Sequence, residues 1–195
     1  MADTIDLGAA ARRMAGLLEA VPEDRLAAPT PCAEYSLADL IDHVGGLSMA
    51  FTMAATKETA RAGAGAPGDG SRLEDGWRGR IAGDLERLAE AWRDPQAWTG
   101  MTRAGGLDLP GEIAGKVALN ELIVHGWDVA RSAGLPYEPD AADLETCRSF
   151  LAASAAQTPE DGSGPFGTPV EIPEDAPLLD RVVALAGRDP AWPAT

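Results

Sequence analysis

The chain has 195 residues, of which 45% are hydrophobic, and a formal net charge of -15 at pH 7. Its length allows one domain with a sizeable core, and its acidity argues against nucleic acid and anionic membrane surfaces, which select Lys and Arg clusters. No membrane-spanning run, signal peptide or disulfide framework is visible, so we expect a soluble, cytoplasmic protein with Cys32 and Cys147 reduced.

Two helices are predicted in the first part of the chain. Residues 4–20 carry apolar side chains at every third or fourth position, and Pro22 ends the pattern. Ser36 is a favourable N-cap for the second helix, and Asp39 stands three residues later in the capping-box position. The second helix is therefore expected to begin directly after Ser36.

Two further helices are predicted in the middle of the chain. Residues 61–71 (RAGAGAPGDGS) are interpreted as a flexible connection, long enough to act as a lid over one end of the bundle. Helical periodicity follows at about 72–93. Residues 96–109 are expected to be a loop with room for a short extended piece. A long helix then covers about 110–133, and Gly134 is expected to end it.

The last third of the chain is predicted to hold two shorter helices. One lies near 140–156 and is followed by a stretch rich in Pro and Gly at 157–173. Asp175 is expected to cap the other, at about 176–186, which ends at Gly187.

These elements indicate an all-α protein. We predict an up-down-up-down four-helix bundle over about residues 4–133, with a short helical C-terminal extension over about 137–195. The whole chain, 1–195, is expected to form a single domain.

The middle of the long fourth helix carries the most informative residues. At about 100° per residue, Glu121, His125 and Asp128 fall on one narrow stripe of this helix. The rest of its circumference is apolar, which is typical of a helix buried by its neighbours. Because a buried carboxylate needs a partner, Glu121 and His125, one turn apart, are candidates to share a divalent cation.

His43 is the only other histidine of the chain. It lies on the shoulder of the apolar stripe of the second helix and can therefore point into the bundle. Asp39, one turn earlier, is a candidate to support its ring. His43, Glu121 and His125 together would suit zinc or another borderline divalent metal and leave a position open for water or substrate.

Other interpretations of the same residues remain open. The Glu and His of the fourth helix can be simple helical neighbours or an ion pair. His43 can be a half-buried histidine bonded to Asp39 or to backbone, and Asp128 can pair with Arg131. Cys32, in the loop before the second helix, can be a reactive thiol at one end of the bundle or a small buried hydrophobic residue.

Several stretches of the sequence together carry a family resemblance. They are TPC at 30–32 leading to YSLADLIDH at 35–43, ELIVHGWDVA at 121–130 followed by Gly134, and, in the tail, FG at 166–167, PEDAP at 173–177, DR at 180–181 and GRDPAW at 187–192. This pattern resembles the mycothiol-dependent maleylpyruvate isomerase N-terminal-domain family of the DinB-like metalloenzyme superfamily. Over nearly the whole chain it is similar to an actinobacterial single-domain subgroup of that family.

The resemblance implies a DinB-like four-helix bundle with a metal, usually zinc, at one end. The metal ligands of the family would correspond to His43, Glu121 and His125. Related enzymes use the metal to bind or activate a low-molecular-weight thiol, such as mycothiol or bacillithiol, for isomerisation or S-transfer. Tyr35 stands where the family usually has Trp, and the residues after Gly134 are too few for the second domain of the two-domain isomerase.

We therefore expect a metal-binding protein that is a mycothiol-dependent transferase or isomerase. Zinc is the favoured metal, with nickel or another divalent ion as alternatives, and the partners are a small-molecule thiol and an electrophilic substrate. Asp39, Asn120 and Asp128 are candidates to support the ligands or to orient substrate, and no residue is assigned to the chemical step. A metal-dependent hydrolase and a non-catalytic binding or regulatory bundle are alternatives, and a homodimer is one possible assembly.

Overall fold

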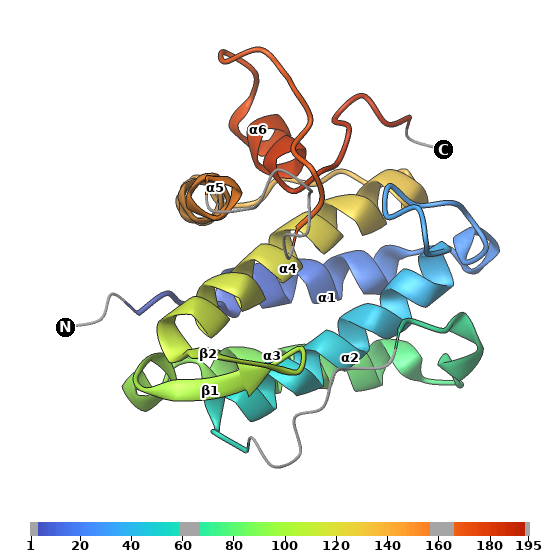
Figure 1. The fold of residues 1–195 in the computed structure, drawn as a ribbon. Coiled ribbons are helices and arrows are strands. Elements are labelled where there is room, and N and C mark those ends of the chain that lie inside the picture. Colours follow the sequence, from blue (N-terminus) through green and yellow to red (C-terminus); the bar gives the residue numbers. More distant parts are fainter. Residues whose placement is uncertain (1–3, 59–66, 157–165, 194–195) are drawn as a thin grey trace.

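The computed structural model describes residues 4–58, 67–156 and 166–193, which form six α-helices and one β-hairpin (Figure 1). The predicted lid at 61–71 and the stretch at 157–173 therefore lie partly outside the described residues. Within the described ranges, none of the helices combines the length and the apolarity that crossing a membrane requires.

The described chain is mostly helical, as predicted. The helices are α1 (Gly8–Ala20), α2 (Leu37–Ala55), α3 (Trp77–Ala91), α4 (Gly111–Ala133), α5 (Ala141–Ala155) and α6 (Leu178–Leu185). The strands are β1 (Met101–Ala104) and β2 (Leu107–Pro110), and short 3-10 turns occupy Glu23–Arg25, Gly70–Arg72 and Pro95–Trp98. Each predicted helix is present, although α1 begins at Gly8 and not at residue 4.

Four helices form the bundle, and two more cover it. α1 and α2 each pack against both α3 and α4, while α5 and α6 pack against α4 and each other (Figure 1). The predicted four-helix bundle with a helical C-terminal extension is thus confirmed. The predicted up-down-up-down order of the four helices is not found, because α2 and α3 run in the same direction. Ile81 lies beside Gly45, and farther along both helices the Trp92 indole donates to the Phe51 carbonyl.

The two predicted helix caps have different outcomes. The Ser36 amide donates to the Asp39 carboxylate over 3.0 Å, and the Asp39 amide donates to the Ser36 hydroxyl over 3.3 Å, which confirms the capping box. The predicted cap at Asp175 is wrong, since α6 begins only after Pro177 and has no side-chain cap. The reason is steric: a residue that precedes proline, here Ala176, is disfavoured in helical conformation.

The region predicted as a loop with a short extended piece contains a β-hairpin. Met101 pairs with Pro110 and Ala104 with Leu107, and the two-residue turn between the strands consists of Gly105 and Gly106. Both glycines have positive φ, 58° and 81°, which is the conformation that tight hairpin turns require. The hairpin is attached to the end of α2 because Thr102 donates to the carbonyl of Ala54 over 2.6 Å.

The start of α4 packs closely against two tryptophans. A Cβ on Gly115 would lie 2.5 Å from the ring of Trp98 and 2.9 Å from that of Trp92. The two rings lie edge to face with centroids 5.0 Å apart, and the Trp98 indole donates to the Trp92 carbonyl. Gly115 therefore allows the close approach of α4 to this cluster.

We expect Gly115→Ala to lower the free energy of unfolding by about 1–3 kcal/mol, because the added methyl group overpacks a filled core. Gly16→Ala is the matched control. Gly16 is also inside a helix, but its added Cβ meets nothing within 4 Å, so the change should stabilise by about 0.5–1 kcal/mol. Urea unfolding followed by circular dichroism measures both; the same sign for the two variants would contradict this account.

Candidate metal centre

The packing of α2 against α4 brings the three predicted ligands together. His43 comes from α2, and Glu121 and His125 come from α4. One donor atom from each side chain can be chosen so that all three lie within 4.8 Å of one another. The rings of His43 and His125 meet edge to face, with centroids 5.2 Å apart. Residues about 80 positions apart in the sequence thus form one compact cluster of two imidazoles and a carboxylate.

His125 is held between two carboxylates of its own helix. Its Nε2 lies 3.0 Å from Glu121 Oε2, and its Nδ1 lies 3.0 Å from Asp128 Oδ2. The helical spacing of four and three residues places both partners on one face of α4. A histidine fixed through one ring nitrogen by a carboxylate, with the other nitrogen aimed at a donor cluster, is the usual arrangement of a metal-ligating imidazole.

Asp128 is fully buried and receives a second partner from the C-terminal part of the chain. Arg188 Nη2 donates to Asp128 Oδ2 over 3.0 Å, and Arg188 Nε reaches Oδ1 at 3.4 Å. The alternative pairing of Asp128 with Arg131 is not made, since Arg131 donates to the carbonyl of Pro190. The guanidinium of Arg188 therefore neutralises the carboxylate that orients His125.

Sequence reasoning did not identify Arg188 as a site residue. It belongs to the tail motif GRDPAW at 187–192, but 60 positions separate Arg188 from Asp128 and no local spacing links them. Only the packing of α5 and α6 onto α4 brings the two side chains together.

The other two predicted supporting residues have no hydrogen bond to His43. Asp39 Oδ2 accepts from Ser36, and Oδ1 accepts from the amide of Gly70 over 2.7 Å, so this carboxylate joins the start of α2 to the segment before α3. Asn120 is buried on α4, and its Oδ1 has no hydrogen-bond partner within the described ranges.

Tyr35 packs beside the other imidazole. Its ring centroid lies 5.2 Å from that of His43, and its hydroxyl accepts a hydrogen bond from the amide of Gly68 over 3.2 Å. The aromatic ring at this position thus covers one side of His43 and connects it to the segment that precedes α3.

The two histidines have opposite pKa shifts. Burial lowers the pKa of His43, and the neighbouring His125 lowers it further. Burial would also lower the pKa of His125, but the hydrogen bonds to Asp128 and Glu121 outweigh it and raise the pKa to about 9. Burial would raise the pKa of Glu121, but the hydrogen bond with His125 and the positive charges of His125, His43 and Arg188 together outweigh burial and lower it. Without a metal, His125 therefore holds a proton that a cation bound at Nε2 would have to displace.

Cys32 lies at the edge of this cluster. Its side chain is half-buried and free, and burial raises the pKa of its thiol, although the positive charge of Arg188 opposes that shift. Asp128 and Glu121 are close enough to raise it further. Cys32 is not among the three donors that come together, and a raised pKa does not favour a reactive thiolate.

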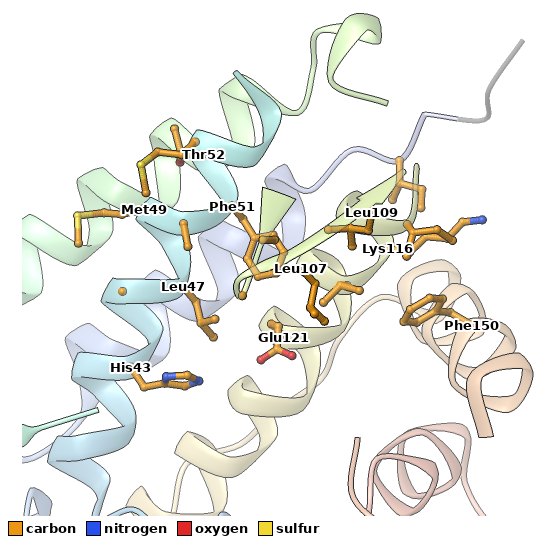
Figure 2. A pocket seen from close by; sticks show the side chains of 18 of the residues that line it. His43, Leu47, Met49, Phe51, Thr52, Leu107, Leu109, Lys116, Glu121 and Phe150 are labelled. Atoms are coloured by element: carbon orange, nitrogen blue, oxygen red, sulfur yellow. The ribbon is translucent and has the colours of Figure 1, made fainter. Parts of the chain in front are cut away.

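A large groove opens beside the cluster. His43 and Glu121 line it, together with side chains of α2, the β-hairpin, α4 and α5. Figure 2 shows the carboxylate of Glu121 and the ring of His43 at one end of this space, with Leu47 and Phe51 continuing along α2. A small molecule in the groove would therefore reach two of the three candidate ligands.

Comparison with known proteins places these features in context. The family model described as the mycothiol maleylpyruvate isomerase N-terminal domain matches residues 7–130. Two uncharacterized proteins, from two strains of Mycobacterium tuberculosis, are each 30% identical over 181 residues, which is 89% of this chain and 91% of theirs.

Solved structures have the same fold. Mycothiol-dependent maleylpyruvate isomerase is similar with a TM-score of 0.58 at 17% identity, over 76% of this chain and 68% of that one. A mutant of this isomerase in which alanine replaces a histidine matches with the same TM-score at 18% identity, over 80% of this chain and 69% of the other.

We expect Arg188→Met to lower the free energy of unfolding by about 2–3 kcal/mol, because it leaves the buried Asp128 carboxylate without its cationic partner. Arg188→Lys, which keeps the charge, should cost less. Arg148→Met is the matched control: Arg148 pairs with Glu145 at the exposed surface, so its loss should leave stability nearly unchanged. Denaturant unfolding would contradict the account if the two methionine variants were equally stable.

Proposed function

The chain belongs to the mycothiol maleylpyruvate isomerase N-terminal domain family, and on that premise we propose that it binds one divalent metal ion and catalyses a thiol-dependent transfer or isomerisation. The observation that carries the proposal is the orientation of the His125 ring. Asp128 fixes its Nδ1, so that Nε2 is directed at Glu121, beside His43.

The donor set fits a borderline divalent ion. Two imidazole nitrogens and one carboxylate oxygen are ligands that zinc accepts, and three protein ligands leave a position open, as catalytic zinc sites do. Zinc is therefore the proposed metal, and nickel is the main alternative. His43, Glu121 and His125 would hold it, with Asp128 and Arg188 keeping His125 in place.

Mycothiol is the proposed thiol cosubstrate, because the structurally similar isomerase is described as mycothiol-dependent. A divalent ion at this site would lower the pKa of a coordinated thiol, so that its sulfur is a nucleophilic thiolate at neutral pH. The protein's own side chains would orient the site and exclude water from it: Asp128 orients His125, Tyr35 covers His43, and the groove admits a second substrate beside Glu121.

We also propose that the whole chain forms one domain that works in a reducing, cytoplasmic setting. Arg188 and Pro190, from the C-terminal part, bond directly to Asp128 and Arg131 of the bundle, so the extension completes the surroundings of His125. Cys32 and Cys147 are both free, which suits a reducing compartment.

Alanine in place of His43 or His125 should abolish metal binding, because each variant removes one of three ligands. We expect about one equivalent of metal in zinc-reconstituted wild-type protein and nearly none in either variant. Glu121→Gln should also weaken binding, whereas Glu112→Gln, on the same helix and groove, is the matched control and should bind normally. Elemental analysis of folded, tag-free protein measures the stoichiometry; wild-type values in both histidine variants would refute the site.

Turnover of an electrophile by the zinc-loaded protein should require mycothiol, because the thiol is a reactant. Zinc-loaded wild type with mycothiol should consume the electrophile, and omission of the thiol or of zinc should reduce the rate to background. Chromatographic detection of the thioether or isomer measures this. Hydrolysis of a model ester at full rate without thiol would contradict the proposal and favour a metal-dependent hydrolase.

A further inference from the structure

We propose that the electrophilic substrate is an uncharged, apolar molecule whose body lies in the groove beside Glu121. The part of this groove lined by Leu47, Phe51, Leu107, Leu109 and Phe150 is called the apolar groove below. This inference rests on the proposed function, because a molecule in the groove is a substrate only if a reaction takes place at the donor cluster.

The apolar groove is continuous with the donor cluster. Leu47 lies one turn of α2 beyond His43, and Phe51 lies one turn beyond Leu47, so these side chains form a line that leads away from the imidazole. Figure 2 shows Leu107 across from Phe51, with Glu121 between them and His43. A molecule with its reactive end at Glu121 would therefore extend its body between α2 and the hairpin.

The hairpin presents an exposed apolar side chain to the groove. Leu107 of β2 is 67% exposed although it is a large apolar side chain, and Leu109 beside it is only partly buried. Across the groove, Phe150 of α5 is also partly exposed. Exposed apolar side chains gathered around a concave site are characteristic of ligand contact, since an isolated domain gains stability by burying them.

The charges along the groove disfavour an anionic substrate. Its described lining has four cationic side chains, Arg72, Arg80, Arg87 and Lys116, against seven carboxylates. Each of the four lies in an ion pair with a carboxylate that also lines the groove. The pairs are Arg72 with Asp42, Arg80 and Arg87 with Asp84, and Lys116 with Glu112.

The four cations thus share three carboxylates, and the carboxylates of the described lining outnumber its cations by three. Beyond the proposed metal ion, a dicarboxylate would compete with these carboxylates for the cations and would meet an excess of negative charge. An uncharged apolar body meets neither cost and gains from burial against Leu47, Phe51 and Leu107. Charge and surface chemistry therefore favour the same class of substrate.

The groove is also large enough for two reactants. Its volume of about 2480 Å³ exceeds the ~300–1,000 Å³ that a single small ligand occupies. A thiol at the donor cluster and an acceptor along the apolar groove can therefore be present together.

For an aryl enone, the chemistry balances without an oxidant or a leaving group. The thiol sulfur forms a bond to the β-carbon, the π-bond of the alkene breaks, and the thiol proton ends on the α-carbon. The reverse elimination would return the thiol and allow geometric isomerisation of the alkene. The neutral enone 4-phenylbut-3-en-2-one is therefore a suitable test substrate.

The test is a fluorescence titration of the full chain with N-phenyl-1-naphthylamine, an uncharged apolar probe, followed by competition. Leu107→Glu should weaken probe binding about tenfold, because it replaces an apolar contact with a charge. Leu107→Lys should weaken it as well, which separates loss of apolar contact from charge repulsion. The matched control is Met101→Glu, on the same hairpin and 61% exposed but outside the groove lining; it should bind within about twofold of wild type.

The competition arm distinguishes the two substrate classes. 4-Phenylbut-3-en-2-one should displace the probe, and fumarate should not. Unchanged binding in both Leu107 variants, or displacement by fumarate as effective as by the enone, would overturn the inference. Circular dichroism spectra check that the variants fold.

Measurements on zinc-loaded and metal-free protein distinguish failure of the apolar-substrate inference from failure of the proposed function. Because probe binding needs neither metal nor thiol, it is measured on zinc-loaded and metal-free protein. A zinc-loaded protein that turns over fumarate with mycothiol, and ignores the enone, would retain the proposed function and overturn the apolar substrate. A protein that takes up no metal but binds the probe at Leu107 would overturn the proposed function, and with it the assignment of the bound molecule as a substrate.

Discussion

A row of buried and partly buried charged groups along α4 is the constraint on which the site depends. Burying unpaired charges among the apolar side chains of a bundle would cost several kcal/mol, so each needs a partner at hydrogen-bond distance. Glu121 bonds to His125, His125 to Asp128, and Asp128 to Arg188, whose guanidinium arrives from the C-terminal part of the chain. Two members of this row, His125 and Glu121, also place an imidazole nitrogen and a carboxylate beside His43. Stability and candidate chemistry therefore arise from one set of contacts, and the C-terminal extension takes part in both.

The elements around this row differ in what they contribute to the site. The donor cluster and nearly all of the four-helix bundle lie within the matched family region, residues 7–130, and the overall fold is that of the isomerase. Leu107 of the hairpin and Phe150 of α5 line the groove from elements outside the four bundle helices. Because these elements contribute side chains to the groove but no donor atom to the cluster, they can change what is bound without changing the candidate ligands. On the proposed function, the residues that contact the substrate would therefore be distinct from those that hold the metal.

Local patterns in the sequence were sufficient for the helices and for the shared face of Glu121 and His125. The proximity of His43, about 80 positions from Glu121, was expected from its place on the apolar stripe of α2 and from the family resemblance. Helical periodicity and the Ser36 cap depend on residues a few positions apart, and such short-range patterns determine local structure in the folded chain. The contact of Arg188 with Asp128 spans 60 positions, so no local pattern contains it. For the hairpin the sequence predicts only a short extended piece within a loop, because Gly105 and Gly106 are typical of loops as well as of a tight turn between strands. The direction of α3 depends on how a long connection runs, which periodicity does not specify.

X-ray absorption spectroscopy at the zinc edge, on zinc-loaded protein with and without mycothiol, tests the central claim most directly. It reports the atoms bound to the metal and is independent of any substrate. The account predicts a first shell of nitrogen and oxygen with imidazole scattering in the protein alone, and one additional sulfur once mycothiol is present. A first shell that lacks imidazole scattering, or that gains no sulfur when the thiol is added, would contradict a thiol-activating metal centre at His43, Glu121 and His125.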